Sequence, residues 1–449
     1  MVYDSIIIGG GLSGLAAAVK LADGGKKIAL FEQAPRLGGR CYSFVDKTTG
    51  DIVDNGQHLL VGAYYNLMEY LDLIGTRNLL SSQPRSKVIF FEAKRGMSAF
   101  SLKELPKPLN LLFGLFNYKH LNPIDRLKLL RIGIELFNWA ASTELRLKKL
   151  TIDEWLDQQR QSEDARKYLW HPLAISIMNE SPKIASALLF ARALRATFLG
   201  SKNDSAILMP AVGQSDLYSE PAIRFLENHS AEIFINKQVA SLFLRDGEIK
   251  GVKLQGGEII ESKSVVSAVN SHAFSDIIPE EWKREKPFCD IEKIQSSPIV
   301  SVNLWFDNDF MDIDSIGLIG GNIHWFFNRR RIISSEKKTG YLSGVISAAR
   351  DYVNLTNEEI TGLALKEIHG IFPQSKKSKL INSLVIREKR ATISATVDAE
   401  ILRPGVESQI NNFFIAGDWT NTGLPATIEG AVLSGFKAAS RVMSLLSNQ

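Results

Sequence analysis

The sequence has very little cysteine and no long hydrophobic run. Cys41 and Cys289 are its only cysteines among 449 residues, and neither lies in a CxxC pair or a histidine cluster. This argues against a disulfide framework and against a structural zinc site, so we expect no metal and a reducing compartment. No stretch of about 18 uncharged apolar residues is present, which argues against a transmembrane span. An apolar segment begins as early as Ser5, which leaves no room for a signal peptide, and we expect a cytoplasmic location.

Internal repeats and low-complexity linkers are also absent, and the composition is that of a globular protein. Hydrophobic residues make up 45% of the chain and charged residues 23%. A chain of 449 residues is long enough for two interleaved domains with ample core.

Positive charge is concentrated in one region. Between Arg85 and Leu150, 13 Lys and Arg residues stand against 5 Asp and Glu, an excess of eight positive charges. Because the whole chain carries +4, the rest of it is negative. The same region holds an apolar run, Leu109–Phe116, and a segment from Ile124 to Trp139 that is typical of a helix.

The segment from Ile124 to Trp139 is apolar around most of its circumference at about 100° per residue. Lys128, Arg131 and Glu135 share a narrow polar stripe. One interpretation is a buried helix of a substrate domain. The other is a monotopic contact with the inner face of the cytoplasmic membrane, where basic residues meet anionic headgroups. Nucleic acid is not expected as a partner, since the basic residues alternate with Leu and Phe and no nucleic-acid motif is present.

The most informative pattern lies in the first forty residues. An apolar run, Ser5–Ile8, stops at a turn of the form GxGxxG, and a helical stretch follows. A second apolar run, Ile28–Phe31, then ends at Glu32. Strand, glycine turn, helix, strand and acid in this order predict a dinucleotide site. The helix N-terminus stabilises the phosphates, and the acid accepts hydrogen bonds from a ribose 2′-OH.

Each glycine of this turn has a separate task. Gly9 permits the tight turn, Gly11 lets the backbone approach a pyrophosphate, and Gly14 lets the helix pack closely on the strand. The residues assigned to the cofactor by this pattern are Gly9, Gly11, Leu12, Ser13, Gly14, Glu32 and Gln33.

A second glycine pair, Gly38-Gly39, follows the acid and is flanked by Arg36 and Arg40. Such a pair suits a bulky diphosphate with an attached ring. Here the sequence resembles the flavoprotein superfamily of amine oxidases and carotenoid desaturases, whose FAD motif continues into a GGR segment. The resemblance favours FAD over NAD and assigns Arg36, Gly38, Gly39 and Arg40 to it. No Cys or His lies in an evident flavinylation motif, so we expect non-covalent FAD.

A segment near the C-terminus carries the resemblance further. Asn412–Trp419 is typical of a short buried strand ending in Gly-Asp, and a helix follows as far as about Leu446. In the resembled superfamily, this Gly-Asp contacts the ribityl and phosphate region, and the helix N-terminus points at the flavin pyrimidine. A helix N-terminus stabilises the negative charge of reduced flavin. The residues assigned to FAD in this way are Gly417, Asp418, Thr427 and Ile428.

The expected fold class is α/β, with a Rossmann-type FAD-binding domain of the GR2-like flavoprotein kind interleaved with an α+β substrate domain. The FAD-binding domain is expected over residues 1–80, 208–269 and 386–449. The substrate domain is expected over 81–207 and 270–385, with membrane-contact helices within 105–140.

Several elements of the middle of the chain can be named. A hairpin is expected around Asp246-Gly247, and substrate-domain strands at Val300–Phe306 and Tyr341–Ala348. Val239 falls where the resembled superfamily lays its backbone against the adenine.

Further segments narrow the resemblance to one family. In order they are Asp54–His58, Trp170–Leu173, Asn179–Pro182, Met209–Leu217, Glu388–Thr392, Gly417–Thr420 and Gly423–Ala431. Together they resemble the squalene-associated FAD-dependent desaturase family over essentially the whole chain. That family acts as hydroxysqualene dehydroxylase in bacterial hopanoid synthesis. The resemblance therefore implies reductive removal of the allylic hydroxyl of hydroxysqualene, a long-chain isoprenoid, to give squalene. The segment Met209–Gln214 departs from the glycine-containing turn expected for the family. This departure bears on the choice of substrate and not on the binding of FAD.

The implied reaction needs an acid for the leaving hydroxyl, a reduced flavin that delivers hydride to the allylic cation, and a dry pocket. The candidates for the acid are His58, Asp54, Asp398 and Glu429. The loop residues Gly56, Gln57 and His58 are also assigned to the cofactor by this resemblance. His58 is the first choice, since imidazolium is a competent donor near neutral pH. The alternative is a structural histidine that bonds the loop backbone.

Two other functions stay open at this stage. A carotenoid (phytoene-type) desaturase or isomerase uses oxidised flavin to take hydride from a polyene. A non-catalytic, FAD-stabilised membrane platform for prenyl synthases binds flavin without turning it over. No second nucleotide fold is evident, so the electron donor is open between NAD(P)H, a quinone and a separate reductase.

Overall fold

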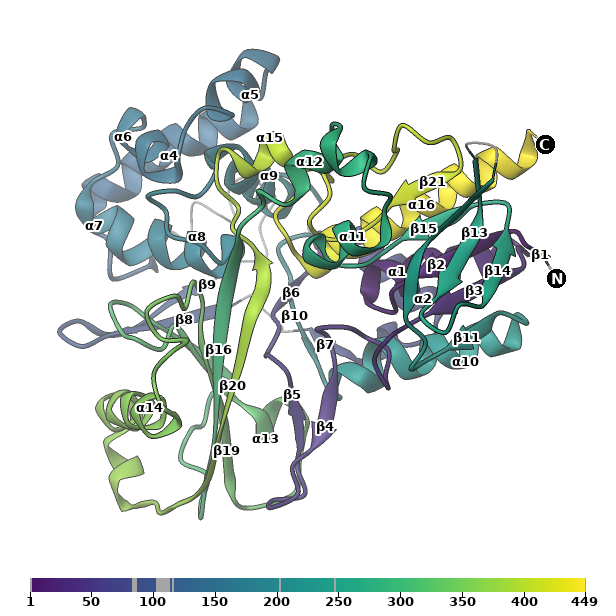
Figure 1. Ribbon diagram of the computed structural model, residues 1–449. Helices are drawn as coiled ribbons and strands as arrows, with labels where there is room; N and C mark the ends of the chain where they lie inside the picture. The colour runs from purple at the N-terminus through teal and green to yellow at the C-terminus, as the bar shows by residue number, and fades with distance from the viewer. Residues whose placement is uncertain are drawn as a thin grey trace.

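A computed structural model describes residues 2–82, 87–101, 114, 117–201, 203–245 and 248–448. Two sheets organise the molecule, one in the half that carries both chain ends and one in the other half (Figure 1). The predicted turn at Asp246-Gly247 and all of the Leu109–Phe116 run except Gly114 lie outside the described residues.

The first sheet has five parallel strands made from the short apolar runs of the sequence. In spatial order they are β11 (Glu232–Phe234), β3 (Ile28–Phe31), β2 (Ser5–Ile8), β15 (Val265–Ser267) and β21 (Phe413–Ile415). All but β11, which is half-buried, are buried along their whole length, as strands covered on both faces are. This confirms the expected α/β fold.

Alternate residues of these strands face different layers. Ile7 and Leu30 pack against helices, whereas Ile6 and Phe31 pack against a second, mainly antiparallel sheet. The helices on the first face are α1 (Leu12–Asp23), α2 (Tyr65–Leu73), α10 (Glu220–Asn228) and α16 (Ile428–Ser447). The sheet on the second face has the order β1 (Val2–Tyr3), β14 (Ile259–Ser262), β13 (Glu248–Leu254) and β12 (Val239–Arg245). The sheet is thus enclosed between helices and strands.

The larger sheet has seven strands and is mainly antiparallel. Its order is β20 (Leu380–Ile393), β16 (Ser296–Phe306), β19 (Gly340–Ile346), β18 (Trp325–Asn328), β17 (Ser315–Leu318), β8 (Lys87–Glu92) and β9 (Gly96–Ser101). The two expected strands correspond to β16 and β19. Helix α14 (Asn357–Ile371) covers one face of the sheet through an apolar cluster.

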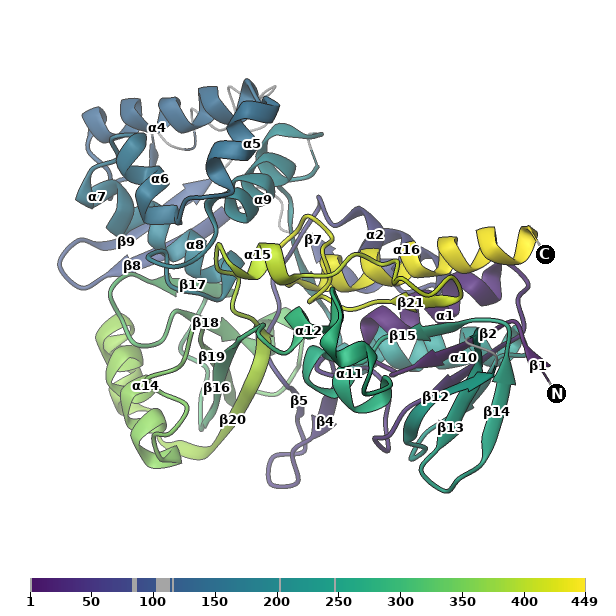
Figure 2. The same ribbon diagram turned by 45° about the horizontal axis from the view of Figure 1, so that its top comes forward.

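A group of helices lies beyond one end of this sheet (Figure 2). They are α4 (Pro123–Phe137), α5 (Ala141–Leu147), α6 (Ile152–Gln158), α7 (Glu163–Ala165), α8 (His171–Met178) and α9 (Ala187–Leu199). The predicted helix at Ile124–Trp139 corresponds to α4. It begins after Asn122, whose side chain accepts a hydrogen bond from the Asp125 N–H, and Pro123 occupies the first turn.

Short elements connect the two sheets. The hairpin of β4 (Ser43–Val45) and β5 (Ile52–Asp54) lies between them (Figure 1), and β6 (Leu60–Val61), β10 (Ile207–Pro210) and β7 (Leu80–Ser82) form a small sheet nearby. The remaining α-helices of the described residues are α11 (Ser271–Ile277), α12 (Phe288–Ile291), α13 (Arg329–Ile332) and α15 (Ala399–Leu402). The predicted domain boundaries stay a prediction.

Candidate functional site

The carboxyl ends of the five parallel strands meet at one edge, where the glycine turn begins. Gly9 has a φ of +102°, a conformation that side chains disfavour. A Cβ on Gly14 would lie 1.9 Å from the Gly9 carbonyl oxygen, so the helix start and the turn touch. A Cβ on Gly11 would meet only the Gly39 Cα, at 4.0 Å. Two glycines are therefore required by the fold itself, and Gly11 instead keeps a space open.

The second glycine pair packs against the first turn. Gly38 and Gly39 both have positive φ, +99° and +60°. The Gly38 N–H donates to the Gly10 carbonyl at 2.8 Å, and a Cβ on Gly39 would come within 3.0 Å of the Gly11 Cα. The two glycine turns thus form one surface of bare backbone beside the start of α1. The spacing alone did not reveal this contact.

Glu32 lies at the same edge, directly after β3. One carboxylate oxygen accepts from the Gly10 N–H and the other from the Ala34 N–H, each at 2.7 Å. These bonds fix the carboxylate, and each oxygen keeps a further lone pair for the predicted ribose contact. Gln33 is exposed, and so is Arg36, whose guanidinium lies 3.8 Å from the centre of the Tyr42 ring. Their predicted contacts with FAD stay predictions.

Arg40 joins three distant segments. One guanidinium nitrogen is 2.7 Å from the Asp418 carboxylate and the other donates to the Ala391 carbonyl at 2.5 Å. Asn55, beyond β5, donates to the Arg40 carbonyl at 3.0 Å. The first sixty residues, β20 and the segment after β21 are therefore held together at this edge.

The C-terminal segment arrives at the same place. Gly417 has a φ of +148°, and its N–H donates to the Ser434 hydroxyl of α16 at 2.8 Å. Thr427 caps α16 by accepting from the Gly430 N–H at 3.2 Å, and Ile428 begins the helix. A Cβ on Gly435 would lie 2.2 Å from the Ser13 carbonyl oxygen, so α16 crosses α1 very closely. The start of α1 therefore lies against Gly435, two turns into α16.

Val239 is the first residue of β12 and is 6% exposed. The chain reaches it from β11 through Lys237, whose N–H donates to the Glu32 carbonyl at 2.9 Å. The segment before Val239 therefore borders the position predicted for the ribose, and the predicted adenine contact of Val239 stays a prediction.

The residues at this edge fit an anionic dinucleotide. Helix α1 has no side-chain cap on its N-terminus and no acidic residue in its first turn, so its N–H groups suit an anion. Two buried polar atoms without a hydrogen-bond partner in the described chain, Gln214 Oε1 and Ser301 Oγ, lie on residues that contact Gly56. Gly56 links them: its carbonyl accepts from Gln214 Nε2, and a Cβ on it would lie 3.8 Å from Ser301 Oγ. Buried polar atoms of this kind need an acceptor or donor from a bound molecule or water.

Two of the four candidates for the acid, Asp54 and Glu429, are held by specific contacts. Asp54 is 6% exposed; one oxygen accepts from the Ser43 hydroxyl and the Gln214 N–H, and the other lies 2.8 Å from Arg329 Nη2. Glu429 accepts from Asn66 and from the Leu67 N–H at 2.9 Å, both at the start of α2.

Burial raises the pKa of Glu429, although these hydrogen bonds oppose the shift. Asp398, a third candidate, is exposed before α15. The contacts of Asp54 and Glu429 are those of residues that hold backbone segments in place.

His58 is different, since its imidazole makes no hydrogen bond to any described part of the chain. Burial lowers its pKa, and nearby Asp54 opposes this shift only in part. The next residue, Leu59, packs against an apolar cluster of Met209, Phe327 and Val345. His58 therefore stands between the polar loop at Gly56 and an apolar region of the larger sheet.

The segment Asn179–Pro182, one of those that carry the family resemblance, joins a helix to the larger sheet. Glu180 is fully buried, and both of its oxygens pair with Arg350 at 2.6 Å. Burial pushes the pKa of Glu180 upward, but the bonds from Arg350 and Ser394 bring it below its usual range. Asn179, with φ +48°, bonds Ser297 on β16 and the backbone of Ala348. This motif joins α8 to the sheet.

Two kinds of feature are absent from the described residues. Among the described residues no helix is long and apolar enough to cross a membrane. The described residues also contain no group of three or more His, Cys, Asp or Glu side chains arranged to hold a metal ion.

Comparison with known proteins identifies the family. The family of flavin containing amine oxidoreductases matches residues 12–443. Hydroxysqualene dehydroxylase of Sinorhizobium fredii is 29% identical with 98% of each chain covered, and 15-cis-phytoene desaturase of Synechococcus elongatus is 24% identical, covering 98% of this chain and 95% of its own.

Solved structures share the fold. A putrescine oxidase variant gives a TM-score of 0.75 and an oxidoreductase of Methanosarcina mazei 0.74, each at 16% identity over 99% of both chains. The expectation of FAD, and of an oxidoreductase that uses it, is confirmed. This chain belongs to the family of flavin containing amine oxidoreductases.

Proposed function

We propose that this protein removes the allylic hydroxyl of hydroxysqualene reductively to give squalene. The reaction replaces a C–O bond by a C–H bond, consumes a hydride equivalent and a proton, and releases water. The relative of 29% identity that covers 98% of both chains is named for this activity, which supports the assignment. The phytoene desaturases, at 24–26% identity, support the broader class of long isoprenoid substrates.

The observation that carries the proposal is the position of His58. A titratable imidazole free of hydrogen bonds to the described chain adjoins Leu59, which packs with Met209 and Phe327. Partly buried Trp325 and Ile299 border the same cluster. An isoprenoid chain needs apolar walls, and a departing hydroxyl needs a proton donor in a site that excludes water. The cluster around Leu59 offers the apolar walls, and the adjoining His58 offers the proton donor.

Each part of the site has a role in the proposal. The backbone of Gly11, Gly38 and Gly39 and the start of α1 hold the diphosphate of FAD, which supplies two-electron redox chemistry when bound. His58 donates the proton to the hydroxyl oxygen. The apolar cluster around Leu59 orients the isoprenoid and keeps water away.

Anaerobic mixing tests the reaction and separates it from desaturation. Protein with reduced FAD is mixed with hydroxysqualene, flavin oxidation is followed by absorbance, and the lipid is extracted and identified. We expect flavin oxidation coupled to squalene formation. Flavin reduction when oxidised protein meets phytoene would instead assign a desaturase. A flavin whose redox state stays unchanged with both lipids would instead favour the non-catalytic membrane platform for prenyl synthases.

We also propose that the protein contacts an anionic membrane surface through α4. This helix buries Leu129, Ile132 and Leu136 on one face. The opposite face carries large apolar side chains that are more than half exposed: Ile124 (66%), Leu127 (57%), Ile134 (61%) and Phe137 (75%). An exposed apolar face of this size on a helix fits the surface of a bilayer.

The charges around α4 favour anionic lipid. Glu135 pairs with Arg146, and Asp125 is buried against Ser162, so neither acid opposes the approach of an anionic surface. Arg131 lies on the exposed face and makes no ion pair within the described chain. Each basic residue close to an anionic surface contributes roughly 1 kcal/mol. This supports a peripheral location on the inner face of the cytoplasmic membrane.

Vesicle sedimentation tests this contact with a matched control. We expect the protein to sediment with vesicles containing phosphatidylglycerol and to be released by salt. Phe137→Glu should abolish sedimentation and leave FAD bound. Ile401→Glu, at an apolar residue of α15 that is also more than half exposed, should sediment like the wild type. A wild-type protein that stays in the supernatant at low salt would contradict the proposal.

A further inference from the structure

Two consecutive arginines join α13 to the β4–β5 hairpin. Arg329 and Arg330 are 1% and 4% exposed. Arg329 Nη2 lies 2.8 Å from Asp54 Oδ2, and Arg330 binds both oxygens of Asp51 at 2.7 Å. The two residues therefore share an element, a degree of burial and a kind of partner.

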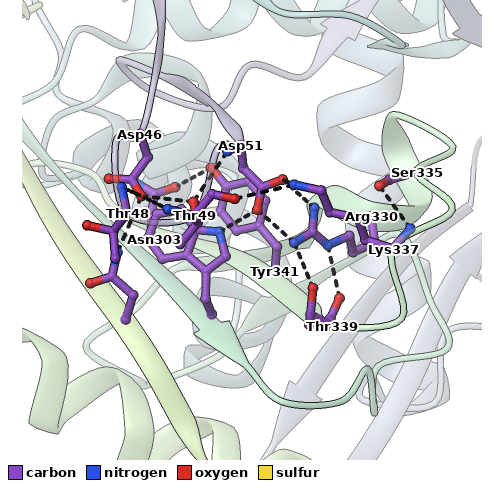
Figure 3. Close-up of polar contacts among 12 residues, drawn as sticks. Asp46, Thr48, Thr49, Asp51, Asn303, Arg330, Ser335, Lys337, Thr339 and Tyr341 are labelled. Carbon is purple, nitrogen blue, oxygen red and sulfur yellow. Dashed lines mark hydrogen bonds and ion pairs between the residues drawn. The ribbon is translucent and has the colours of Figure 1, made fainter.

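Their remaining contacts differ. Arg330 also donates to the carbonyl and hydroxyl of Thr339, and Lys337 joins it on Asp51 (Figure 3). These contacts stay within the hairpin and the segment before β19. Arg329 Nη1 instead donates to Gln57 Oε1, in the loop between β5 and β6. Within the described chain, Arg329 bonds the loop that holds Gly56 and His58, whereas Arg330 bonds Asp51 and Thr339.

This bond fixes which way the Gln57 carboxamide faces. An arginine has five donors and no acceptor, so Gln57 must turn its oxygen to Arg329 and its NH2 group away. Within the described chain, the bond from Gln57 Nε2 is a long one, 3.5 Å to the His58 carbonyl. At least one N–H of Gln57 is therefore available to a bound molecule.

We infer that Arg329 is a positioning residue, which holds the Gln57 amide as a hydrogen-bond donor toward the flavin. The inference rests on the proposed function and on the predicted contact of Gly56, Gln57 and His58 with FAD. Asp54 faces the Arg329 guanidinium as an ion pair at 2.8 Å, without a hydrogen bond to it, and the Ser43 hydroxyl and the Gln214 N–H donate to Asp54. Residues of α13, β4 and β5 thereby act together on one side chain of the loop.

A donor beside the flavin has a measurable consequence. Reduced flavin is richer in electrons than oxidised flavin, so an N–H donor and a nearby buried cation both favour the reduced form. Loss of the donor should lower the equilibrium constant of flavin reduction. We expect a decrease of about tenfold, which equals about 30 mV for a two-electron couple.

The test compares holoproteins by their flavin midpoint potential and absorption spectrum. Arg329→Lys keeps the charge but loses the fork that orients Gln57, and Gln57→Leu removes the donor itself. Both should lower the potential. Arg330→Lys is the matched control: it should lower the thermal midpoint to a similar extent as Arg329→Lys and leave the potential unchanged.

The outcomes distinguish a failure of the positioning role from a failure of the proposed function. A Gln57→Leu variant with the wild-type potential would overturn the inference, and so would equal potential shifts in Arg329→Lys and Arg330→Lys. Gln57 is only half-buried, so its variant remains informative even if the arginine variants fold poorly. Wild-type protein that lacks FAD would refute the proposed function itself. Yellow wild-type protein with unshifted variants would refute the positioning role alone.

Discussion

The glycine turns at the edge of the parallel sheet and the hairpin on α13 build the site in opposite ways. The first presents bare backbone: Gly39 packs against the Gly11 backbone, and the space that a Gly11 side chain would occupy is open. The second is crowded with buried charge, since Asp51 is shared by Arg330, Lys337 and the Trp305 indole N–H. One region leaves room for a ligand, and the other holds two parts of the chain together.

The difference teaches which changes should affect the cofactor and which the fold. A side chain placed in an open space leaves the stability of the apoprotein unchanged and interferes only with binding of the ligand. Removing one partner of a buried ion pair leaves the other uncompensated, at a cost of about 3–5 kcal/mol. Variants of the two regions should therefore fall into separate classes, loss of FAD and loss of stability.

The largest expected effect is at Gly11. Gly11→Val puts a branched side chain where only the Gly39 Cα lies within 4 Å of the new Cβ. The residue has φ −72°, which valine adopts without strain. We expect a stable but colourless apoprotein, measured by FAD content after purification and by thermal unfolding. In wild-type protein, acid precipitation should release the FAD.

Gly14→Ala is the contrasting change in the same turn. Its Cβ would lie 1.9 Å from the Gly9 carbonyl oxygen, so the apoprotein itself should lose stability. A yellow Gly11→Val variant with normal FAD content would contradict the assignment of this turn.

The next effect concerns His58, which lies between the two regions. His58→Ala and His58→Gln should keep FAD but lower turnover by about 10²–10⁴-fold, as loss of a general acid does. His229→Gln, at an exposed histidine bonded to its own helix, is the control. Near-normal activity in the glutamine variant would move the acid to Asp54, Asp398, Glu429 or bound water.

The pH dependence of kcat/KM tests the role of His58 in a second way, because an acid and a base give opposite directions of change. The pKa of His58 is lowered from 6.5, mainly by burial. If His58 is the acid, kcat/KM falls as pH rises through this lowered pKa, because the protonated form disappears. If His58 is instead a base in a desaturation, kcat/KM rises through the same pKa. The profile of the wild-type enzyme with each lipid therefore distinguishes the two functions.

In the crowded region, Asp51→Asn should cost about 3 kcal/mol or more in unfolding free energy, because Arg330 and Lys337 lose their partner. The pKa of Asp51 is about 2, since the bonds from Arg330 and Lys337 outweigh the opposing effect of burial. A carboxyl with a lowered pKa stabilises the fold above its unfolded pKa of about 3.9. This stability is lost as pH falls toward 2.

The wild type should therefore lose this stability in acid between about pH 4 and pH 2, and the variant should not show that limb. FAD affinity should be unchanged, measured by titration of the apoprotein. A variant that unfolds like the wild type at neutral pH would show that the buried pair contributes little.

The same contrast explains what the sequence could and could not predict. The glycine turns were predictable because strand, turn, helix and acid are local features with a fixed period. Gln57 and Arg329 are 272 residues apart, and nothing in either neighbourhood indicates the other. Their contact depends on how the two sheets meet.

Glu429 shows the same limit at a residue that sequence reasoning did select. Its place in the first turn of α16 suggested the flavin, yet its carboxylate bonds the start of α2. Helix boundaries were predicted to within a few residues, as at α4, because periodicity and caps are local. Which face of α4 is buried could not be predicted, since that depends on the helices packed against it.

The smallest expected effect is at Thr427, where one substitution should affect both the stability of the fold and the binding of FAD. Thr427→Ala removes the bond to the Gly430 N–H and should cost about 1 kcal/mol of stability. Thr356→Ala removes the equivalent cap of α14, where the Glu359 N–H donates to Thr356 at 3.1 Å. That helix packs on the larger sheet, so the Thr356 variant should lose similar stability with FAD affinity unchanged. If Thr427 also contacts FAD as predicted, its variant should bind FAD several-fold more weakly, and Thr427→Ser should restore both properties. Equal FAD affinity in the two alanine variants would make Thr427 a cap alone and leave the bare backbone of the glycine turns, with α1, as the principal site for the cofactor.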